Sequence, residues 1–232
     1  SIVNNIRITN LYTATNFRIE DKSRLITSDV DDHIYFWNLN DHTLISKYSG
    51  LSDNNETCDK LFAGKDNLTY ICTNYNIRCY DYETNQVKWL IKPEENEYWY
   101  NFSLSPSGEM MAFSHLNIVE VLDLKQGKIV QSYVLDEKDD SICEIIWNPN
   151  EKQLSLGSIG FLEPGWLRTI DLESGKNKLI QEFDEWNELS ISYRDTDSVA
   201  CLWYNTQLAA NYMYTQENYY IAEYDCNTGE QC

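Results

Sequence analysis

The chain has 232 residues, of which 42% are hydrophobic and 13% aromatic, so it is long enough to bury a sizeable core in one domain. Its 18 Lys and Arg residues stand against 37 Asp and Glu residues, which gives a formal net charge of −19. This charge argues against DNA, RNA and anionic membranes as partners, because they are themselves negatively charged. It favours either simple solubility or a basic protein partner. No apolar run approaches the roughly 18 residues of a membrane-spanning helix.

The seven cysteines are scattered at no spacing typical of metal ligands. Their odd number and their position in strand-like segments favour reduced thiols and therefore a cytoplasmic protein. Cys72 and Cys79 flank one short hairpin turn, so a disulfide between them is the alternative at that place. No secretory signal peptide is visible, and one that was already removed is the alternative for the N-terminus.

The predicted elements begin with three consecutive strands between Leu25 and Ser49. Branched and aromatic residues fill the strands, and turns rich in Asp and Asn separate them at 29–32 and 40–42. Branched and aromatic side chains fit a pleated surface, whereas Asp and Asn bond to their own backbone in turns. The stretch is therefore typical of an all-β protein.

The same unit of strand, polar turn and strand recurs along the chain. Each apolar strand ends in an Asp or Asn, and these marker residues are Asn38, Asp81, Asp123, Asp171 and Asp225. Successive markers are 43, 42, 48 and 54 residues apart, a period typical of propeller blades. Two proline-containing turns, at 105–108 and 148–151, fall in phase with this repeat.

The segment SDVDDHIYFWN, residues 28–38, resembles the second half of a WD-repeat blade. That family has Ser, a turn Asp, and then Thr or His followed by Ile-x-apolar-Trp-Asp. Here Asn38 replaces the last Asp, and the Gly-His pair usually found upstream is missing. The resemblance implies four-stranded blades, which the repeat places at residues 13–49, 58–91, 98–135, 142–183 and 188–226.

We therefore predict that residues 1–232 form a single domain, a five-bladed β-propeller. The last blade lacks a fourth strand, and residues 2–8 are a strand-like segment that could supply it. Counted through the chain ends, Asp225 and Asn38 are 45 residues apart, close to the other spacings. Closing the ring in this way would remove two exposed sheet edges. The alternative is a fragment of a larger ring, since the WD-repeat family usually has seven blades.

The last blade also contains an unusually long connection at residues 205–218. We expect it to hold a helical turn at 207–211, and connections longer than usual are often functional.

The resemblance further implies that two kinds of connection emerge on one face of the ring. One kind joins the outer strand to the next blade, and the other joins the second strand to the third. With their edges they hold 18 of the 37 acidic residues, and aromatic residues lie beside them. Acidic groups speed the encounter with a basic protein, and aromatic groups supply affinity. The predicted partner-binding residues are Asp53, Glu56, Glu94, Glu95, Glu97, Trp99, Asp136, Glu137, Asp139, Asp140, Asp184, Glu185, Trp186, Tyr212 and Tyr214. The alternative is that these loops are simply solvated.

No catalytic or metal-binding constellation stands out. The three histidines form no pair at helical spacing, and the nucleophile-elbow motif is absent. Asp29, Asp31 and Asp32 suggest Ca²⁺, but the glycine and terminal Glu of a helix-loop-helix calcium site are missing. We therefore predict no catalytic residue, no metal site and no cofactor. Paired carboxylates of the glycosidase type are the alternative.

These observations predict a non-enzymatic protein-binding module that is a monomer outside its complex. One version is an inhibitor or immunity protein that covers a basic toxin, because toxins that degrade nucleic acids are often basic. The first alternative is a WD-repeat-like scaffold subunit of a larger assembly. The second is a carbohydrate-binding or carbohydrate-active propeller.

Overall fold

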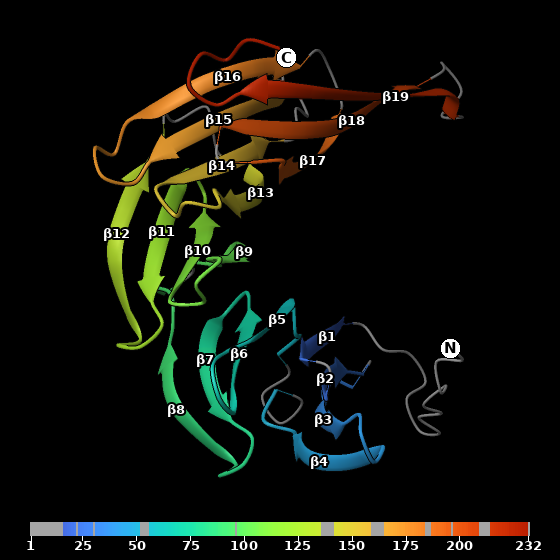
Figure 1. Cartoon of the computed structure of the whole chain (residues 1–232), viewed down its shortest axis with the longest axis vertical. Coiled ribbons are helices and arrows are strands. Elements are labelled where there is room, and N and C mark those ends of the chain that lie inside the picture. Colours follow the sequence, from blue (N-terminus) through green and yellow to red (C-terminus); the bar gives the residue numbers. More distant parts are fainter. Residues whose placement is uncertain are drawn as a thin grey trace. The chain divides into compact units, whose positions relative to one another are not determined.

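The computed structural model describes residues 16–21, 23–29, 31–51, 56–95, 97–135, 142–158, 165–183, 187–195, 197–208 and 214–231. These residues form five antiparallel sheets (Figure 1). None of the described residues belongs to a membrane-spanning helix. The chain divides into two compact units, residues 1–99 and residues 100–232.

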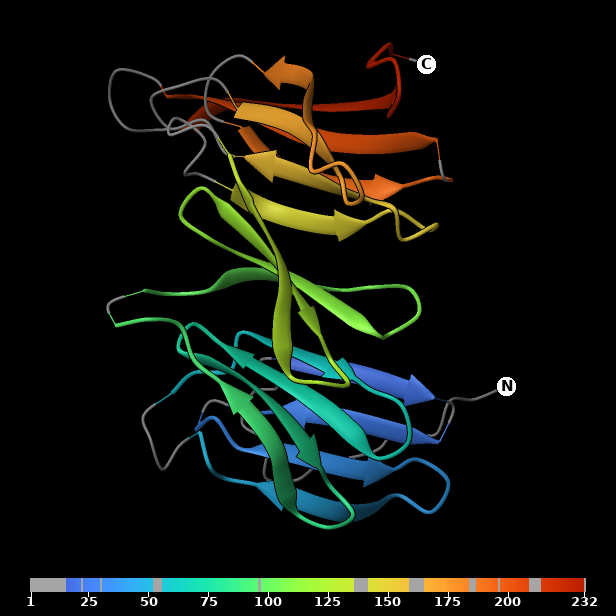
Figure 2. The ribbon, with the colours of Figure 1, turned by 90° about the vertical axis from the view of Figure 1, so that its left-hand side faces the viewer.

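The first unit contains two four-stranded sheets. The strands of the first sheet are β1 (Asn16–Asp21), β2 (Arg24–Ser28), β3 (Ile34–Asn38) and β4 (Thr43–Tyr48), in that spatial order. The strands of the second are β5 (Lys60–Ala63), β6 (Leu68–Thr73), β7 (Asn76–Asp81) and β8 (Gln86–Ile91). The two sheets stack on a shared core that includes Ile26, Phe36, Ile71 and Tyr80 (Figure 2).

The second unit contains three sheets. The first holds β9 (Tyr100–Leu104), β10 (Met110–His115), β11 (Ile118–Asp123) and β12 (Lys128–Val134). The second holds β13 (Ile142–Trp147), β14 (Gln153–Ser158), β15 (Gly165–Asp171) and β16 (Asn177–Phe183). The third holds β17 (Asn187–Tyr193), β18 (Ser198–Leu208) and β19 (Tyr214–Asp225).

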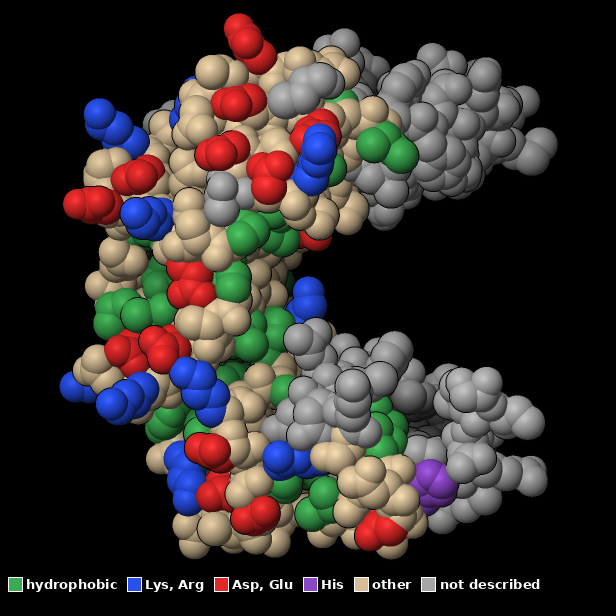
Figure 3. Space-filling model, in the orientation of Figure 1, with side chains coloured by type: hydrophobic (Ala, Val, Ile, Leu, Met, Phe, Trp, Pro, Cys, Tyr) green, Lys and Arg blue, Asp and Glu red, His purple; other side chains and the backbone are tan. Residues whose placement is uncertain are grey.

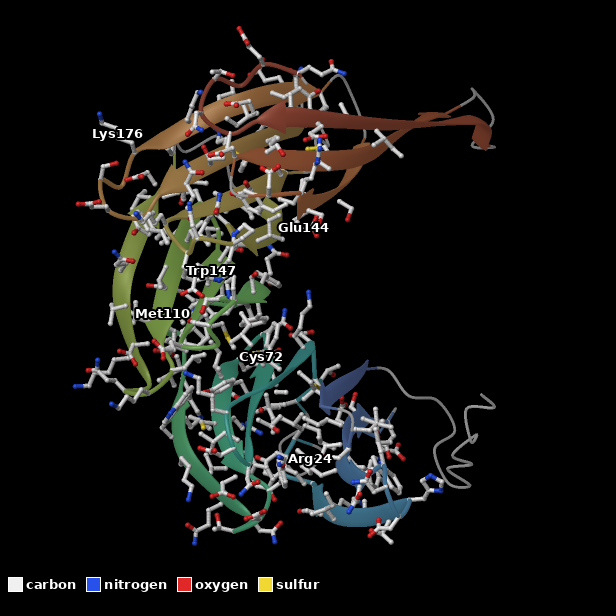
Figure 4. All side chains as sticks on the ribbon, viewed as in Figure 1. Arg24, Cys72, Met110, Glu144, Trp147 and Lys176 are labelled. Atoms are coloured by element: carbon white, nitrogen blue, oxygen red, sulfur yellow. The ribbon has the colours of Figure 1, made fainter. Side chains whose placement is uncertain are left out.

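Within each unit, the first strand of one sheet lies beside the first strand of the next: β1 beside β5, β9 beside β13, and β13 beside β17. Polar contacts join these sheets across the apolar layers. The Trp147 indole Nε1 donates to the Ser103 carbonyl at 2.9 Å, and the Ile191 N–H donates to the Glu144 carboxylate at 2.6 Å. Arg24 donates to the Asn67 side-chain oxygen at 3.0 Å; Figure 4 labels Arg24, Glu144 and Trp147. Directional bonds of this kind fix how one sheet is placed on the next.

Four of the predicted blade ranges each contain one four-stranded sheet, and the last sheet begins at Asn187, one residue before the fifth range. Residues 2–8 lie outside the described residues, so ring closure through them stays a prediction. The grouping of all five sheets into a single domain also stays a prediction. The last sheet has three strands among the described residues.

One detail of the sequence-based predictions is wrong. Gln207 and Leu208 belong to strand β18 and not to a helical turn, because β18 and β19 keep pairing as far as Leu208 and Tyr214. Residues 209–211 of the expected turn lie outside the described residues. Cys72 and Cys79 are not joined by a disulfide, so the structure does not contain the bond that was the alternative to reduced thiols at this hairpin. Each stands opposite a different residue of the neighbouring strand, Ile77 and Tyr70 respectively.

The marker residues of the repeat all end the third strand of a sheet and close the turn that follows. Asp123 Oδ1 accepts the backbone N–H groups of Lys125 at 2.9 Å and of Gln126 at 2.8 Å. The four other markers accept backbone N–H groups in the same way; they are Asn38, Asp81, Asp171 and Asp225. Hydrogen bonds donated by the turn residues hold the pKa of all four Asp markers below the ordinary value.

Asp81 offers a test of these turns, because turn N–H groups and Lys88 lower the pKa of its carboxyl to about 2. We expect Asp81→Ala to lower the melting temperature by roughly 2–4 °C at pH 7, the effect of losing about 1 kcal/mol. A pKa depressed in the folded state stabilises the protein above the unfolded pKa of about 4, and this contribution disappears as the pH falls through about 2. The melting temperatures of the unchanged protein and of Asp81→Ala should therefore converge between pH 4 and pH 2. The exposed Glu83→Ala is the control, and a difference that stays constant with pH would contradict the prediction.

Candidate protein-binding surface

In the first unit, the connection that follows an outer strand lies beside the turn between the second and third strands of a sheet, as the WD-repeat resemblance implies. The N–H of Cys58, in the connection from β4 to β5, donates to Asp32 of the β2–β3 turn at 3.0 Å. The N–H of Trp99, after β8, donates to the carbonyl of Asn74 in the β6–β7 turn at 2.9 Å. In the second unit, Asn117 of the β10–β11 turn and Leu135, after β12, exchange two hydrogen bonds of 2.8 Å.

The buried hydroxyl of Thr73 fixes the β6–β7 turn. Thr73 Oγ1 accepts the N–H groups of Tyr75 at 3.1 Å and of Asn76 at 3.0 Å. Thr73 and Asn76 are themselves buried, so the turn has little freedom to move. This arrangement holds Tyr75 outward, with 50% of its surface exposed.

Trp99 does not lie on the binding surface that the sequence predicts. Its side chain is only 2% exposed, as expected for a large apolar indole. The buried ring and the bond from its N–H to Asn74 hold the connection in place. Its chain neighbour Tyr98 is 44% exposed, as expected where successive side chains of an extended chain point to opposite sides.

Tyr75 and Tyr98 meet edge to face, with ring centroids 5.3 Å apart. Next to Tyr98, the Glu97 N–H donates to the Glu94 carbonyl at 3.1 Å, which closes a turn that carries three glutamates. Glu94 and Glu95 are exposed, and Glu97 is half-buried. We call Tyr75, Tyr98, Glu94, Glu95 and Glu97 the acidic tyrosine surface.

Glu56 has a structural role instead of a place on the surface. Its carboxylate forms an ion pair with Arg78, whose side chain is 3% exposed, and accepts a hydrogen bond from Asn76 Nδ2 at 2.8 Å. Arg78 also donates to the Tyr48 hydroxyl at 3.0 Å and lies over the Tyr48 ring. A guanidinium buried in this way requires a nearby carboxylate, so Glu56 is committed to Arg78.

Most other predicted partner-binding residues lie outside the described residues, and for them the prediction stays open. These are Asp53, Asp136, Glu137, Asp139, Asp140, Asp184, Glu185, Trp186 and Tyr212. Tyr214 begins β19, where its backbone pairs with Leu208. Tyr75 is not among the residues predicted from the sequence, although its place between two asparagines in a hairpin turn indicates exposure.

Asp29, Asp31 and His33 place ligand atoms within 4.8 Å of one another. The Asp29 carboxylate is already used by the protein: it accepts the N–H groups of Asp31 at 3.0 Å and His33 at 2.9 Å, and the Tyr35 hydroxyl at 2.9 Å. Burial and the bond to Asp29 raise the pKa of Tyr35 to about 12. The Asp29 carboxylate of this cluster is therefore part of the hydrogen-bonded turn between β2 and β3.

No family model and no curated protein matches this chain. Among solved structures it is similar to hydrazine synthase from Kuenenia stuttgartiensis, with a TM-score of 0.66 and 15% identity over 94% of this chain and 66% of that one. It is also similar to the Pan2 WD40 domain from Neurospora crassa, with a TM-score of 0.65 and 10% identity over 94% and 64% of the two chains. A WD40 domain of coronin from Toxoplasma gondii gives a TM-score of 0.58 and 12% identity over 80% and 53%.

The chain thus spans at most 66% of the length of each of these proteins. At such low identity the likeness concerns the fold alone. Together with the five antiparallel sheets, it shows that the chain has a WD-repeat-like β-propeller fold and confirms the resemblance found in the sequence.

The structural role of Glu56 can be tested by stability. We expect Glu56→Ala to lower the free energy of unfolding by about 3 kcal/mol, because it leaves the buried Arg78 without its carboxylate. The exposed Glu94→Ala should change it by less than about 0.5 kcal/mol. Urea unfolding at neutral pH measures both values, and equal values for the two variants would contradict the assignment.

Proposed function

We propose that this chain is a non-enzymatic protein-binding module and that the acidic tyrosine surface holds a basic partner protein. The observation that carries the proposal is the pair of exposed tyrosines, Tyr75 and Tyr98, in ring contact beside Glu94, Glu95 and Glu97. Tyrosine is enriched among the residues that dominate protein interfaces, and glutamates at a rim guide a positively charged partner.

The way in which these side chains are held supports the proposal. Thr73 fixes the turn that carries Tyr75, and the buried Trp99 anchors the segment that carries Tyr98. Side chains that are already ordered lose little conformational entropy on binding. An exposed but ordered aromatic pair is therefore well suited to a hot spot.

Two of the structural neighbours are WD40 domains, which agrees equally well with a scaffold subunit of a larger assembly. The narrower prediction, an inhibitor or immunity protein against a basic toxin, receives no support from the comparisons. In the scaffold alternative, the affinity for the partner would depend on contacts of the aromatic rings and hardly on the salt concentration. The absence of enzymatic activity, a monomeric state and a cytoplasmic location are parts of the same proposal.

The first test captures the partner from the native source on the immobilised protein, washed at low and at high salt. The association of the captured partner is then measured with Glu94, Glu95 and Glu97 all changed to Lys. We expect association to slow by roughly tenfold or more, because steering by rim charges is lost. The control is Glu83→Lys, which reverses one charge in the β7–β8 turn at the other end of the same sheet and should leave the rate within about twofold.

A second test addresses the tyrosines. We expect Tyr75→Ala and Tyr98→Ala each to weaken binding by about 2 kcal/mol, mainly through faster dissociation. Dissociation rates from surface plasmon resonance report this effect directly. A partner that binds all these variants like the unchanged protein would show that its interface lies elsewhere. If the tyrosine-to-alanine changes weaken binding, the glutamate-to-lysine changes do not, and the affinity is independent of salt, the scaffold alternative would be favoured.

A further inference from the structure

The second unit has an open sheet edge at β12. This strand is the outermost in its sheet and pairs only with β11 among the described residues. Ile129, Val130 and Val134 of β12 are exposed, and Val134 reaches 69%. Apolar side chains reach the surface along the flank that β12 forms (Figure 3). An edge of this kind is a template for another strand.

The direction of the free backbone groups follows from the ladder. Leu135, just after β12, donates its N–H to the Asn117 carbonyl on the β11 side at 2.8 Å. Backbone groups alternate in direction along an antiparallel strand, so Tyr133 also points its N–H toward β11. The N–H groups of Ser132 and Val134 therefore point away from the sheet and are available to a strand from outside.

A groove runs beside this edge. A hollow of about 420 Å³ lies between β12 and the segment from Leu172 to Asn177, and a neighbouring one of about 340 Å³ extends it toward Met110 and Trp147. Gln131 and Tyr133 both donate to the Leu172 carbonyl, at 3.0 and 2.8 Å. These bonds join β12 to the segment that forms the other wall of the groove. Figure 4 labels Met110 on β10 and Trp147 on β13.

The charged groups of the groove are mainly acidic. Glu151, Asp171 and Glu173 line it together with a single lysine, Lys152. Glu173 is exposed and stands in the wall of both hollows. The groove thus favours a positively charged ligand, whereas the opposite flank of β12, next to Val134, favours an apolar one.

We infer that the β12 edge binds an extended peptide of alternating apolar and basic residues, which adds to the sheet as a fifth strand. Alternate side chains of a strand point to opposite faces, so the basic ones would enter the groove and the apolar ones would cover Val134. This site is separate from the acidic tyrosine surface and does not depend on the function proposed for that surface.

The fourth strands of the three other four-stranded sheets are less suited to strand addition. Lysines within edge strands discourage it, and β4, β8 and β16 carry Lys47, Lys88 and Lys178 inside the strand. In β12 the only lysine, Lys128, is the first residue. This leaves the half of β12 that includes Ser132 and Val134 without such protection.

The test uses a hexapeptide labelled with fluorescein at its N-terminus, fluoresceinyl-KVKVTV-amide, and measures its binding by fluorescence anisotropy at about 0.15 M salt. We expect saturable binding to the unchanged protein. Ser132→Pro removes one outward N–H group without breaking a bond to β11, and it should weaken binding roughly tenfold. The matched control Ser132→Ala keeps the N–H and should stay within about twofold.

A second measurement needs no change in the protein, which covers the case in which Ser132→Pro fails to fold. The same peptide, N-methylated at alternate backbone positions, has equal charge but cannot pair as a strand. We expect the N-methylated peptide not to bind. We also expect Glu173→Lys to weaken the binding of the parent peptide about tenfold, whereas Glu83→Lys should leave it unchanged. Absence of binding by the parent peptide, or equal binding by its N-methylated form, would overturn the inference.

Discussion

The architecture depends on one repeated interaction, in which the side chain at the end of the third strand accepts N–H groups of the turn that follows it. Asp81, Asp123, Asp171 and Asp225 do this with a carboxylate, and Asn38 does it with an amide. The bond fixes where the third strand stops and where the outer strand begins. Because the turn is fixed, the register of the outer strand follows in the four sheets that have a fourth strand.

Each of the four outer strands departs from a regular ladder soon after this turn. One extra residue is inserted in every case: Ile45, Lys88, Val130 and Ile180. A bulge of this type increases the local twist and turns the edge away from regular pairing. The sheets thereby avoid joining edge to edge over much of their length. The short regular part of β12 after its bulge has the exposed Val134 and lies beside a groove.

The acidic tyrosine surface illustrates how a rigid fold orders ordinary turn residues into a candidate interaction site. Thr73 and Trp99 are buried, yet they decide where Tyr75 and Tyr98 point. Glu56 and Arg78 perform a similar task below the surface, since their ion pair stabilises the connection from β4 to β5. Residues of the interior therefore determine the geometry of the candidate site, and residues of the turns supply its chemistry.

The sequence by itself determined the all-β class, the five repeats and the WD-repeat resemblance, because these depend on local patterns. Strand residues alternate, and Asp or Asn must follow each third strand to close its turn. The tertiary structure alone decided which aromatic residues are exposed: Trp99 lies inside and Tyr75 outside, although both are large rings near polar turns. It also decided that Glu56 is committed to Arg78, which lies 22 residues away in the chain. Burial and ion pairing depend on contacts between distant segments, and a local pattern contains no information on those contacts.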